Sequence, residues 1–373
     1  MTTKLKNPQG ANSFFESTNR YLIGIPLSVS TITPGANSQE LQPIEITPGN
    51  YFRGVEIQVT SSGGVLGSTD SLVGDAPFSA LQSLSFETVD GSQILYPKGG
   101  YAEYIIQKWC QPWCGDPAKD AGDNGSSGAG LFPGFSNSIN PAWRQKYMIE
   151  NRFSVAVLPN TDARAQYRLN LTVAAFVGGL VSTGTGSTAP AITITVTGLY
   201  YAQPPATDAH GTPNTIVPPG IAFQRKTRHE LPGISSGDYV FTSKLTGNLI
   251  RNDIFVVRNS SGVRTDLTGD PIIITLSNQA LGKPSRSAVL YDMITSAAAG
   301  GLGSLNNVVR DTGVYVFPHW HNPGDLMGDP WLKTLESDYY TYEFSGAPSG
   351  GSIEHITEEI IPVGNAPASL FDI

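Results

Sequence analysis

The sequence predicts an all-β protein, and three observations support this: abundant glycine and proline, a low charge, and alternating apolar and polar residues. Glycine and proline contribute 41 and 27 of the 373 residues, and both interrupt regular helices. Charged residues make up 14% and hydrophobic residues 39% of the chain, whereas an average soluble protein carries about 25% charged residues. This composition suits a loop-rich β protein with broad buried surfaces. It argues against a helical bundle and a coiled coil, and the hydrophobic fraction is too high for a disordered chain.

Apolar and polar residues alternate with a period of two in several segments, which is the pattern of half-buried strands. In one of them, Val55, Ile57 and Val59 alternate with polar residues. The same alternation occurs at 153–157, 167–173, 192–197 and 340–344. Each such strand has one apolar face, so the segments predict sheets that pack face to face.

Two further segments, 254–257 and 272–274, are apolar without interruption. A strand of this kind is expected to be covered on both faces. The cover would be a second layer, a second domain or a partner subunit.

Two short helices are expected within the β framework. Asn140 and Pro141 are typical of a helix start, and Trp143 and Tyr147 would then share one face. The second helix is expected at about 285–299, where apolar residues recur four positions apart and a pair of glycines follows.

The two halves of the chain are similar to each other. The segment GNYFR at 49–53 matches GNLIR at 247–251 in its glycine, asparagine and arginine, with an offset of 198 residues. Each match opens a predicted strand and is followed by a Gly/Ser turn. Each half also ends in two long predicted strands joined by a Gly-rich loop, at 165–177 with 190–201 and at 331–344 with 352–363. The shared order of elements predicts a duplicated β domain.

A proline-rich segment separates the halves. Residues 203–220 contain five prolines and no periodicity, which predicts an extended, semi-rigid connection. Each half supplies about eight strands, which fits two tandem eight-stranded jelly rolls with short helical inserts and long loops. The expected division is an N-terminal arm at 1–20, a first roll at 21–203, a linker at 204–220, a second roll at 221–365 and a C-terminal tail at 366–373. Loop 111–138 is too long for a simple connection and is expected to project from the surface.

The charge pattern argues against sequence-specific binding of nucleic acid. The formal net charge is −8, and the longest basic run is Arg225-Lys226, with Arg228 close by. Residues 1–20 lack the apolar core of a secretory signal, and the longest apolar stretch, 173–181, is about half the length of a membrane-spanning helix. A chain that is soluble when made is expected.

Cys110 and Cys114 are the two cysteines. Their C-x-x-x-C spacing differs from the C-x-x-C of redox and zinc sites, and no second pair completes a zinc tetrahedron. We expect structural free thiols in a turn packed by the neighbouring tryptophans; a local disulfide or a reactive thiol is the alternative.

His319 and His321 are the sharpest candidates for a metal site. With Gly313 and Asp325 they approximate the first metal motif of cupins, in which two histidines on one strand face and a carboxylate hold a metal ion. The usual glutamate is replaced by Asp325, and too few strands follow for a cupin barrel. The expected role is instead a strand that ends at Pro318, with its histidines in a subunit contact.

The other candidate sites are weaker, and no catalytic, cofactor-binding or metal-ligating residue is expected. The carboxylate groups Glu336 with Asp338, and Glu354 with Glu358 and Glu359, lack evidence of a cleft; Glu354 and Glu358 are expected on a solvated face. Ser235 lies in a G-x-S-x-G motif without the strand and helix of a nucleophile elbow. The last candidates are loop residues that could bind calcium but lack the complete spacing of a calcium-binding motif: Asp120, Asp123 with Asn124, Asp266 and Asp270.

Tyrosine pairs occur at Tyr200-Tyr201 and Tyr339-Tyr340. Aromatic residues can form a platform for sugars or nucleic acid, but no basic residues are interleaved with them. We expect these tyrosines in strand cores and protein contacts.

The pattern resembles the double jelly-roll major capsid proteins of tailless icosahedral bacteriophages, such as tectiviruses and corticoviruses. The resemblance covers about 21–363, and its motifs are unspecific. The segments that carry it are 51–60, 78–81 and 91–94 in the first half, and 237–239, 249–257, 312–316, 329–332 and 361–363 in the second.

This resemblance implies a non-enzymatic capsid subunit. It implies homotrimers that form pseudo-hexagonal capsomers and tile an icosahedral shell with minor capsid and penton proteins, as part of a virion assembled in the host cytoplasm. Loop 111–138 would form a tower. Segments 1–20, with Lys4 and Lys6, and 366–373 would be arms to neighbours or to an internal viral membrane. The alternatives are a carbohydrate-binding phage spike or tail protein, and a bicupin-like metalloenzyme that uses His319 and His321.

Overall fold

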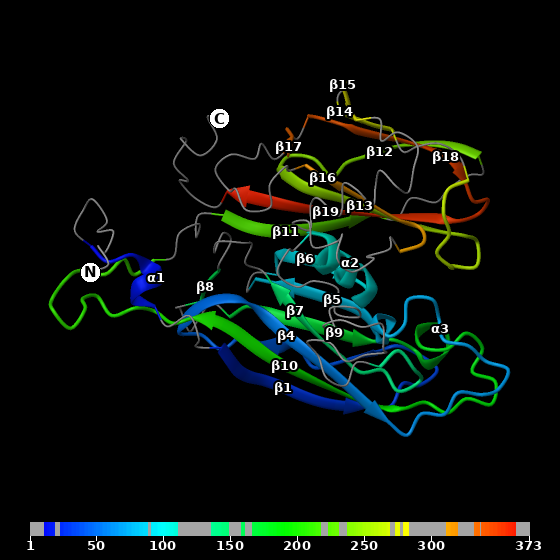
Figure 1. Cartoon of the computed structure of the whole chain (residues 1–373), viewed down its shortest axis with the longest axis horizontal. Helices are drawn as coiled ribbons and strands as arrows, with labels where there is room; N and C mark the ends of the chain where they lie inside the picture. Colours follow the sequence, from blue (N-terminus) through cyan, green and yellow to red (C-terminus); the bar gives the residue numbers. More distant parts are fainter. Residues whose placement is uncertain are drawn as a thin grey trace, which may run out of the picture.

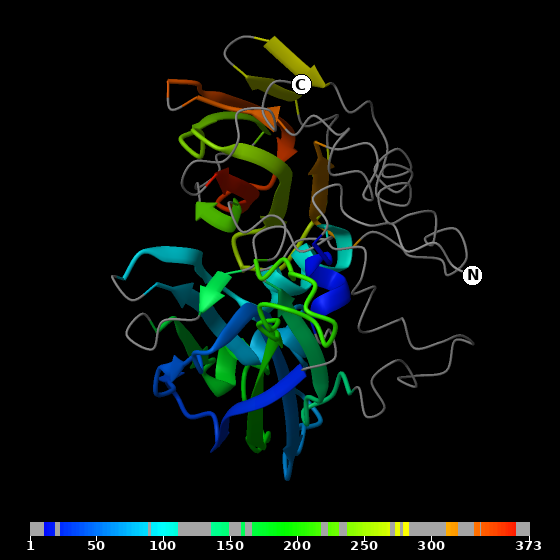
Figure 2. The same ribbon diagram turned by 90° about the vertical axis from the view of Figure 1, so that its left-hand side faces the viewer.

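Two β sandwiches lie one above the other in the computed structural model (Figure 1). The structure describes residues 11–18, 23–88, 91–110, 136–148, 158–160, 166–217, 223–230, 237–268, 273–276, 279–282, 311–319, 332–335 and 337–362. Strands β1 to β10 build one sandwich and β11 to β19 the other, and a view at right angles shows the same separation (Figure 2).

The first sandwich, which we call the first roll, pairs a sheet in the order β1-β10-β4-β7 with a layer in the order β6-β5-β9-β2. Two short strands lie off these paths: β3 pairs with β9, and β8 with β4. The strands are β1 (Ile23–Ile32), β2 (Gln39–Glu40), β3 (Ile44–Glu45), β4 (Asn50–Ser62), β5 (Leu81–Glu87), β6 (Gln93–Lys98), β7 (Trp143–Met148), β8 (Leu158–Asn160), β9 (Arg168–Val173) and β10 (Ala191–Tyr201).

The second roll repeats this arrangement. Its layers have the orders β11-β19-β13-β16 and β12-β18-β14-β15, and the short β17 pairs with β13 as β8 pairs with β4. The strands are β11 (Phe223–Glu230), β12 (Gly237–Ser243), β13 (Leu249–Arg258), β14 (Ile273–Leu276), β15 (Gln279–Gly282), β16 (Val314–Pro318), β17 (Leu332–Lys333), β18 (Tyr340–Ala347) and β19 (Ser352–Pro362).

When the main strands of each roll are counted along the chain, both rolls have the order 1-8-3-6 in one layer and 2-7-4-5 in the other. This is the eight-stranded jelly roll, present twice, so the predicted fold class is confirmed. The matching segments at 49–53 and 247–251 lie at the starts of β4 and β13, the third strand of each roll. The short sequence similarity therefore marks topologically equivalent strands.

The offset of 198 residues also relates the cores of the two rolls. Ile57 and Val59 of β4 correspond to Phe255 and Val257 of β13, and all four side chains are buried. Val55 corresponds to Asp253, which is also fully buried. A carboxylate thus stands in the second core where the first has a valine.

The rolls are joined edge to edge. The fifth strand of the first roll, β6, lies parallel to the first strand of the second roll, β11, with Leu95 beside Thr227. This pairing merges one layer of each roll into a ten-stranded sheet.

The apolar run at 254–257 is buried on both faces, as predicted. Ile254 and Val256 belong to the apolar cluster that continues into the first roll, whereas Phe255 and Val257 face the core of the second. The cover on the first face is the other roll of the same chain. Of the run at 272–274, Ile273 and Ile274 lie in β14.

The helix predicted to start at Asn140 is wrong: Trp143–Met148 forms strand β7. Trp143, Gln145 and Tyr147 are buried, and Arg144 and Lys146 between them are exposed. A spacing of four residues is one helical turn but also two strand repeats, so Trp143 and Tyr147 fit either structure. Pairing with β4 decides for the strand. The helix predicted at 285–299 lies outside the described residues.

The longest described helix was not predicted. Helix α2 (Gly100–Cys110) follows β6 directly and lies between the rolls (Figure 1). Its side chains Tyr101, Ala102, Tyr104, Ile105 and Ile106 are all buried. Both rolls cover it, so residues 101–106 are all buried and Glu103 is the one charged residue among them. The shorter helical turns are α1 (Phe14–Ser17), η1 (Phe78–Ala80) and α3 (Phe176–Gly179).

Candidate functional site at the junction of the two rolls

The junction between the rolls is built around helix α2. Ile105 and Ile106 are fully buried and belong to the same apolar cluster as Ile254 and Val256 of the second roll. Burying one isoleucine side chain stabilises a fold by about 1.5–3 kcal/mol. The helix therefore fixes the two rolls to each other through apolar contact.

Lys98, at the end of β6, forms a buried polar contact across the junction. Its Nζ lies 2.9 Å from Glu103 Oε2 of α2 and donates to Thr227 Oγ1 of β11 at 2.8 Å. Lys98 and Glu103 are buried. A buried charge requires a partner, so this contact specifies how β6, α2 and β11 meet.

Asp75 of the first roll lies between two arginines of the second. Its carboxylate oxygens are 2.7 Å from Arg258 Nη1 and 2.7 Å from Arg264 Nε. Arg264 also donates to the carbonyls of Gly74 and Thr312 and lies 4.5 Å above the ring of Tyr101. This ion cluster, which we call the Asp75 cluster, closes one end of the junction.

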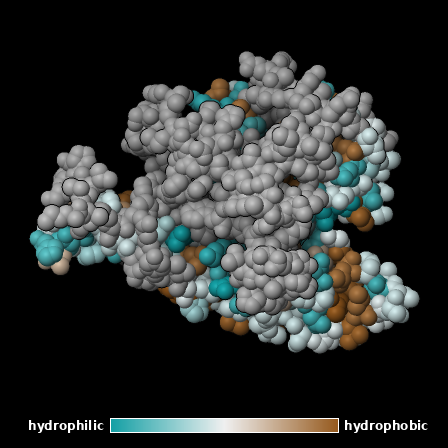
Figure 3. Space-filling view, viewed as in Figure 1, coloured by the Kyte–Doolittle hydropathy of each residue, from teal (hydrophilic) through white to brown (hydrophobic). Residues whose placement is uncertain are grey.

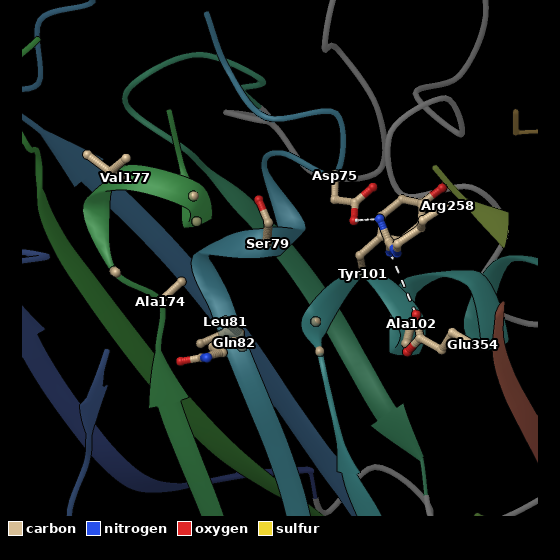
Figure 4. A pocket seen from close by; sticks show the side chains of 15 residues that line it. Asp75, Ser79, Leu81, Gln82, Tyr101, Ala102, Ala174, Val177, Arg258 and Glu354 are labelled. Carbon is tan, nitrogen blue, oxygen red and sulfur yellow. Dashed lines mark ion pairs between the residues drawn. The ribbon is translucent and has the colours of Figure 1, made fainter. Parts of the chain in front are cut away.

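A pocket of about 300 Å³ lies beside the Asp75 cluster (Figure 4). Arg258 and Glu354 of the second roll form its charged wall, with 3.6 Å between Arg258 Nη2 and Glu354 Oε2. The charges of the wall largely compensate each other. The rest of the lining comes from the first roll and includes Ser79, Gln82, Gly99, Gly100, Ala102, Ala174 and Gly179.

These junction residues were missed by the sequence analysis. Lys98 and Thr227 are 129 residues apart, and Arg264 and Asp75 are 189 apart. No local spacing could have identified them, because their partners come from the other roll.

Glu354 and Glu358 were expected on a solvated face, and this is wrong. Glu354 is 8% exposed and Glu358 is fully buried. Both lie on β19, a central strand whose two faces are covered, one by the second roll's own core and the other by the junction. Glu354 pairs with His229 at 3.2 Å, Glu358 with Arg251 at 3.6 Å, and Glu359 with Arg228 at 2.6 Å. Structural side-chain contacts therefore occupy these positions.

His319 follows the end of β16 at Pro318, as predicted, and belongs to a polar cluster in the second roll. Its Nε2 lies 2.8 Å from Asp253 Oδ2. The other oxygen of Asp253 lies 2.9 Å from His355 Nε2, and His355 Nδ1 lies 3.0 Å from Glu230 Oε1. Tyr342 donates to Asp253 at 3.3 Å. We call these five residues the Asp253 cluster.

The cluster shifts the pKa values of its members. Burial alone would raise the pKa of Asp253, but hydrogen bonds from His319 and His355 lower it to about 2. Burial alone would lower the pKa of His355, but Asp253 and Glu230 raise it above its usual value. Since both ring nitrogens of His355 face carboxylates, the ring donates at both only as an imidazolium.

His319 points to a carboxylate that His355 also contacts, and these groups bond to one another rather than surround an open position. In the segments that the structure describes, no group of three or more histidine, cysteine, aspartate or glutamate residues could hold a metal ion. His321 and Asp325 lie outside the described residues. The expectation of no metal, no cofactor and no catalytic residue stays a prediction.

The remaining candidates have structural contacts or lie outside the described residues. Asp266 accepts a hydrogen bond from the Gly313 amide at 2.7 Å, and Asp338 accepts one from the Leu335 amide at 2.6 Å. Cys110 ends helix α2 rather than lying in a turn. Candidates outside the described residues are Cys114, Asp120, Asp123, Asn124, Ser235, Asp270 and Glu336.

Tyr200 and Tyr201 are buried, as expected for strand-core residues, whereas Tyr339 is 39% exposed. Tyr201 also contacts the predicted N-terminal arm. The rings of Tyr51 and Tyr201 pack edge-on against Phe14 of α1, with centroid distances of 5.6 and 5.8 Å. Phe14 is 2% exposed. Residues 11–18 are thus held on the first roll.

The predicted linker also contacts residues 11–18. The Asn12 amide donates to the Pro213 carbonyl at 2.8 Å, and its side chain donates to Asp208 and Asn214. Asp208 in turn accepts from the amides of His210 and Thr212. Arm and linker therefore form one hydrogen-bonded unit beside β4 and β10.

An exposed apolar patch lies near α3, at the end of the first roll that is far from residues 11–18 (Figure 3). Val65, Leu66 and Val177 are 58%, 40% and 47% exposed there. Exposed apolar patches are suited to protein contacts. Of the described helices, none is long and apolar enough to cross a membrane.

The geometry defines the class of fold: two jelly rolls of identical strand order, joined edge to edge within one chain. Comparison with solved structures gives the same result. The major capsid protein of STIV, in its crystal structure, matches with a TM-score of 0.54 and 13% identity over 90% of this chain and 97% of that chain. A chain in the atomic structure of Sulfolobus Turreted Icosahedral Virus matches with a TM-score of 0.57 and 12% identity, over 92% of this chain and 95% of that chain.

The quasi-atomic model of the PBCV-1 virus capsid also matches, with a TM-score of 0.57 and 10% identity over 90% of this chain and 92% of that chain. No family model and no curated protein matches the sequence. At these identities the likeness shows the fold. The chain has the double jelly-roll fold of viral major capsid proteins.

Proposed function

We propose that this protein is the major capsid protein of an icosahedral virus. The observation that carries the proposal is the repetition of the strand order 1-8-3-6 and 2-7-4-5 in two joined rolls. The solved structures that match over more than nine tenths of their own length include the STIV major capsid protein and the PBCV-1 virus capsid. A non-enzymatic, structural role follows from this proposal.

The duplicated fold supplies a physical reason for assembly. Each chain presents two similar rolls, so a closed ring of three chains presents six similar sides. Such a pseudo-hexagonal unit can tile a shell with the same kind of contact on every side. Penton and minor capsid proteins would fill the positions that six-sided units cannot occupy. The chain would therefore reside in the virion capsid, after assembly in the host cytoplasm.

The domain division is proposed as the sequence suggests it, with rolls at 21–203 and 221–365 and a linker at 204–220. Segments 1–20 and 366–373 would act as arms to neighbouring capsomers or to an internal membrane. Because residues 11–18 contact the linker and β4, we assign the arm role to residues 1–10.

The test is the mass of the purified full chain by light scattering after size exclusion, with electron microscopy of the same fraction. Trimers have three times the 39.7 kDa mass of the chain and should have six-sided outlines. Metal analysis of the same peak addresses the cupin-like alternative. A monomer or dimer with stoichiometric metal would contradict the capsid proposal.

A further inference from the structure

We infer that the edge of β1 in one copy lies beside the edge of β15 in the next copy, and that this contact repeats the β6–β11 junction inside each chain. The inference rests on the proposed function, because it names the surfaces through which the proposed trimer closes. The occupant of each edge is a second copy of this chain.

The argument starts from the equivalence of strands. In each roll the first strand lies at one end of one layer and the fifth strand at one end of the other layer. Inside the chain, the fifth strand of the first roll, β6, meets the first strand of the second roll, β11. Two equivalent edges remain: β1, the first strand of the first roll, and β15, the fifth strand of the second. Among the described residues, β1 pairs with β10 alone and β15 with β14 alone.

The pairing registers of the strands identify the residue on β1 that is equivalent to Thr227 on β11. In the second roll, Thr227 lies opposite Glu358, which lies opposite Asn252. In the first roll, Ile23 lies opposite Leu199, which lies opposite Gly54. Gly54 and Asn252 are separated by the 198-residue offset of the repeat. Ile23 therefore occupies the place of Thr227.

The pairs in the two hairpins identify the residue on β15 that is equivalent to Leu95 on β6. In the β5–β6 hairpin, the pair nearest the loop is Glu87 with Gln93, and the next is Phe86 with Leu95. In the β14–β15 hairpin, the pair nearest the loop is Leu276 with Gln279, and the next is Thr275 with Ala280. Ala280 therefore occupies the place of Leu95. Since Leu95 lies beside Thr227, the inferred contact places Ala280 beside Ile23 of the next copy.

Neither edge carries the charged side chains that commonly protect an exposed strand. Natural proteins protect an exposed strand edge with charges, prolines or bulges, because its unpaired amides and carbonyls recruit other strands. The ten residues of β1 and the four of β15 include no charged side chain. By contrast, β7 at the other edge of the β1 sheet carries exposed Arg144 and Lys146. Pro26 and two register shifts limit pairing on β1 to a short stretch, as at the single β6–β11 bridge.

The contact between copies differs from the internal junction in one respect. The second roll presents Ile254 and Val256 to the first roll, and these side chains are buried. The equivalent positions on the first roll are Glu56 and Gln58, and the face that carries them also holds exposed Arg144. The apolar surface that fixes the internal junction is thus replaced by a polar one. Each chain can therefore fold before it associates.

The contact has a direction that an experiment can detect. One β1 edge meets one β15 edge, so the interface is heterologous, and the proposed trimer is the ring that three such contacts close. The test uses full-length chains with Cys110 and Cys114 replaced by serine and one cysteine introduced, either Ile23→Cys or Ala280→Cys. The two chains carry different tags, are co-expressed, and are treated with a short bismaleimide cross-linker. Light scattering on the untreated sample gives the oligomeric state.

We expect covalent heterodimers from the co-expressed chains and none from either chain alone. The double variant I23C/A280C should give covalent trimers without longer products. In the matched control, Thr31→Cys replaces Ile23→Cys; residue 31 lies on the same strand about 26 Å away at 3.3 Å per residue. The control should reduce the yield of heterodimer at least tenfold.

Three results would overturn the inference. Cross-linking of Ile23→Cys chains to each other would show that two β1 edges meet. Trimers by light scattering without a 23–280 cross-link would reject the edge contact and leave the capsid proposal standing. Chains that remain monomeric and form no six-sided units would overturn both.

Discussion

Asp253 and His355 lie side by side in the core of the second roll, with 2.9 Å between Asp253 Oδ1 and His355 Nε2. Both residues are fully buried. The equivalent of Asp253 in the first roll is Val55, so the duplicated fold does not require a carboxylate at this position. The stability of the second roll therefore depends on the protonation states of Asp253 and His355.

We expect Asp253→Asn to lower the free energy of unfolding by about 3–5 kcal/mol, the usual cost of removing one partner of a buried ion pair. The amide leaves the imidazolium of His355 beside a group that also presents N–H donors. Urea unfolding monitored by fluorescence measures the change. Glu343→Gln, at an exposed position on β18, is the matched control and should shift stability by less than about 0.5 kcal/mol. Equal effects of the two changes would contradict this account.

The pKa shifts predict a pH range of greatest stability. The pKa of His355 is raised in the fold, so its contribution is complete below the unfolded value of about 6.5 and is lost as pH rises through the folded pKa. The pKa of Asp253 is lowered to about 2, so its contribution is complete above about 4 and is lost as pH falls through the folded pKa. Thermal unfolding from pH 3 to 9 should therefore show a maximum at roughly pH 4–6.5.

His355→Gln should flatten the alkaline side of this profile, because the titrating imidazole is gone. His210→Gln provides the control, since His210 is exposed in the linker. A profile that keeps its alkaline slope in His355→Gln would assign the slope to another group.

Asp75→Asn should weaken the junction between the rolls. Arg258 and Arg264 would lose their shared carboxylate, and the loss of charged hydrogen bonds costs about 1.5–3 kcal/mol. We expect faster cleavage between the rolls in limited proteolysis and a lower unfolding midpoint. Glu40→Gln, an exposed change in the first roll, should leave both measurements unchanged. Identical cleavage patterns for Asp75→Asn and the native chain would show that the junction does not depend on the Asp75 cluster.

Truncation should separate the two parts of the N-terminal arm. Deleting residues 1–10 should leave the contacts of Asn12 and Phe14 intact and impair shell formation without loss of the trimer. Deleting residues 1–20 should also expose Tyr51 and Tyr201 and lower the unfolding midpoint, because Phe14 is buried between them. Light scattering and thermal unfolding of both truncations provide the measurements. Loss of the trimer in the shorter truncation would place residues 1–10 in the trimer interface instead.

The sequence by itself determined the strands with alternating residues and the duplication. Alternation at 167–173 and 192–197 is local information, because the side-chain period of a strand follows from the backbone alone. The repeat at Gly49 and Gly247 is likewise local, and it marks equivalent strands.

Only the tertiary structure decided which faces are covered. The spacing of Trp143 and Tyr147 fits a helix or a strand, and the pairing of their segment with β4 makes it a strand. The sequence pattern places Glu358 at a solvated position, but the first roll covers the face of β19 that carries it. Lys98 and Asp75 become part of a junction only when residues more than 100 positions away lie beside them. Burial depends on such distant partners, and their positions are a property of the folded chain rather than of any one segment.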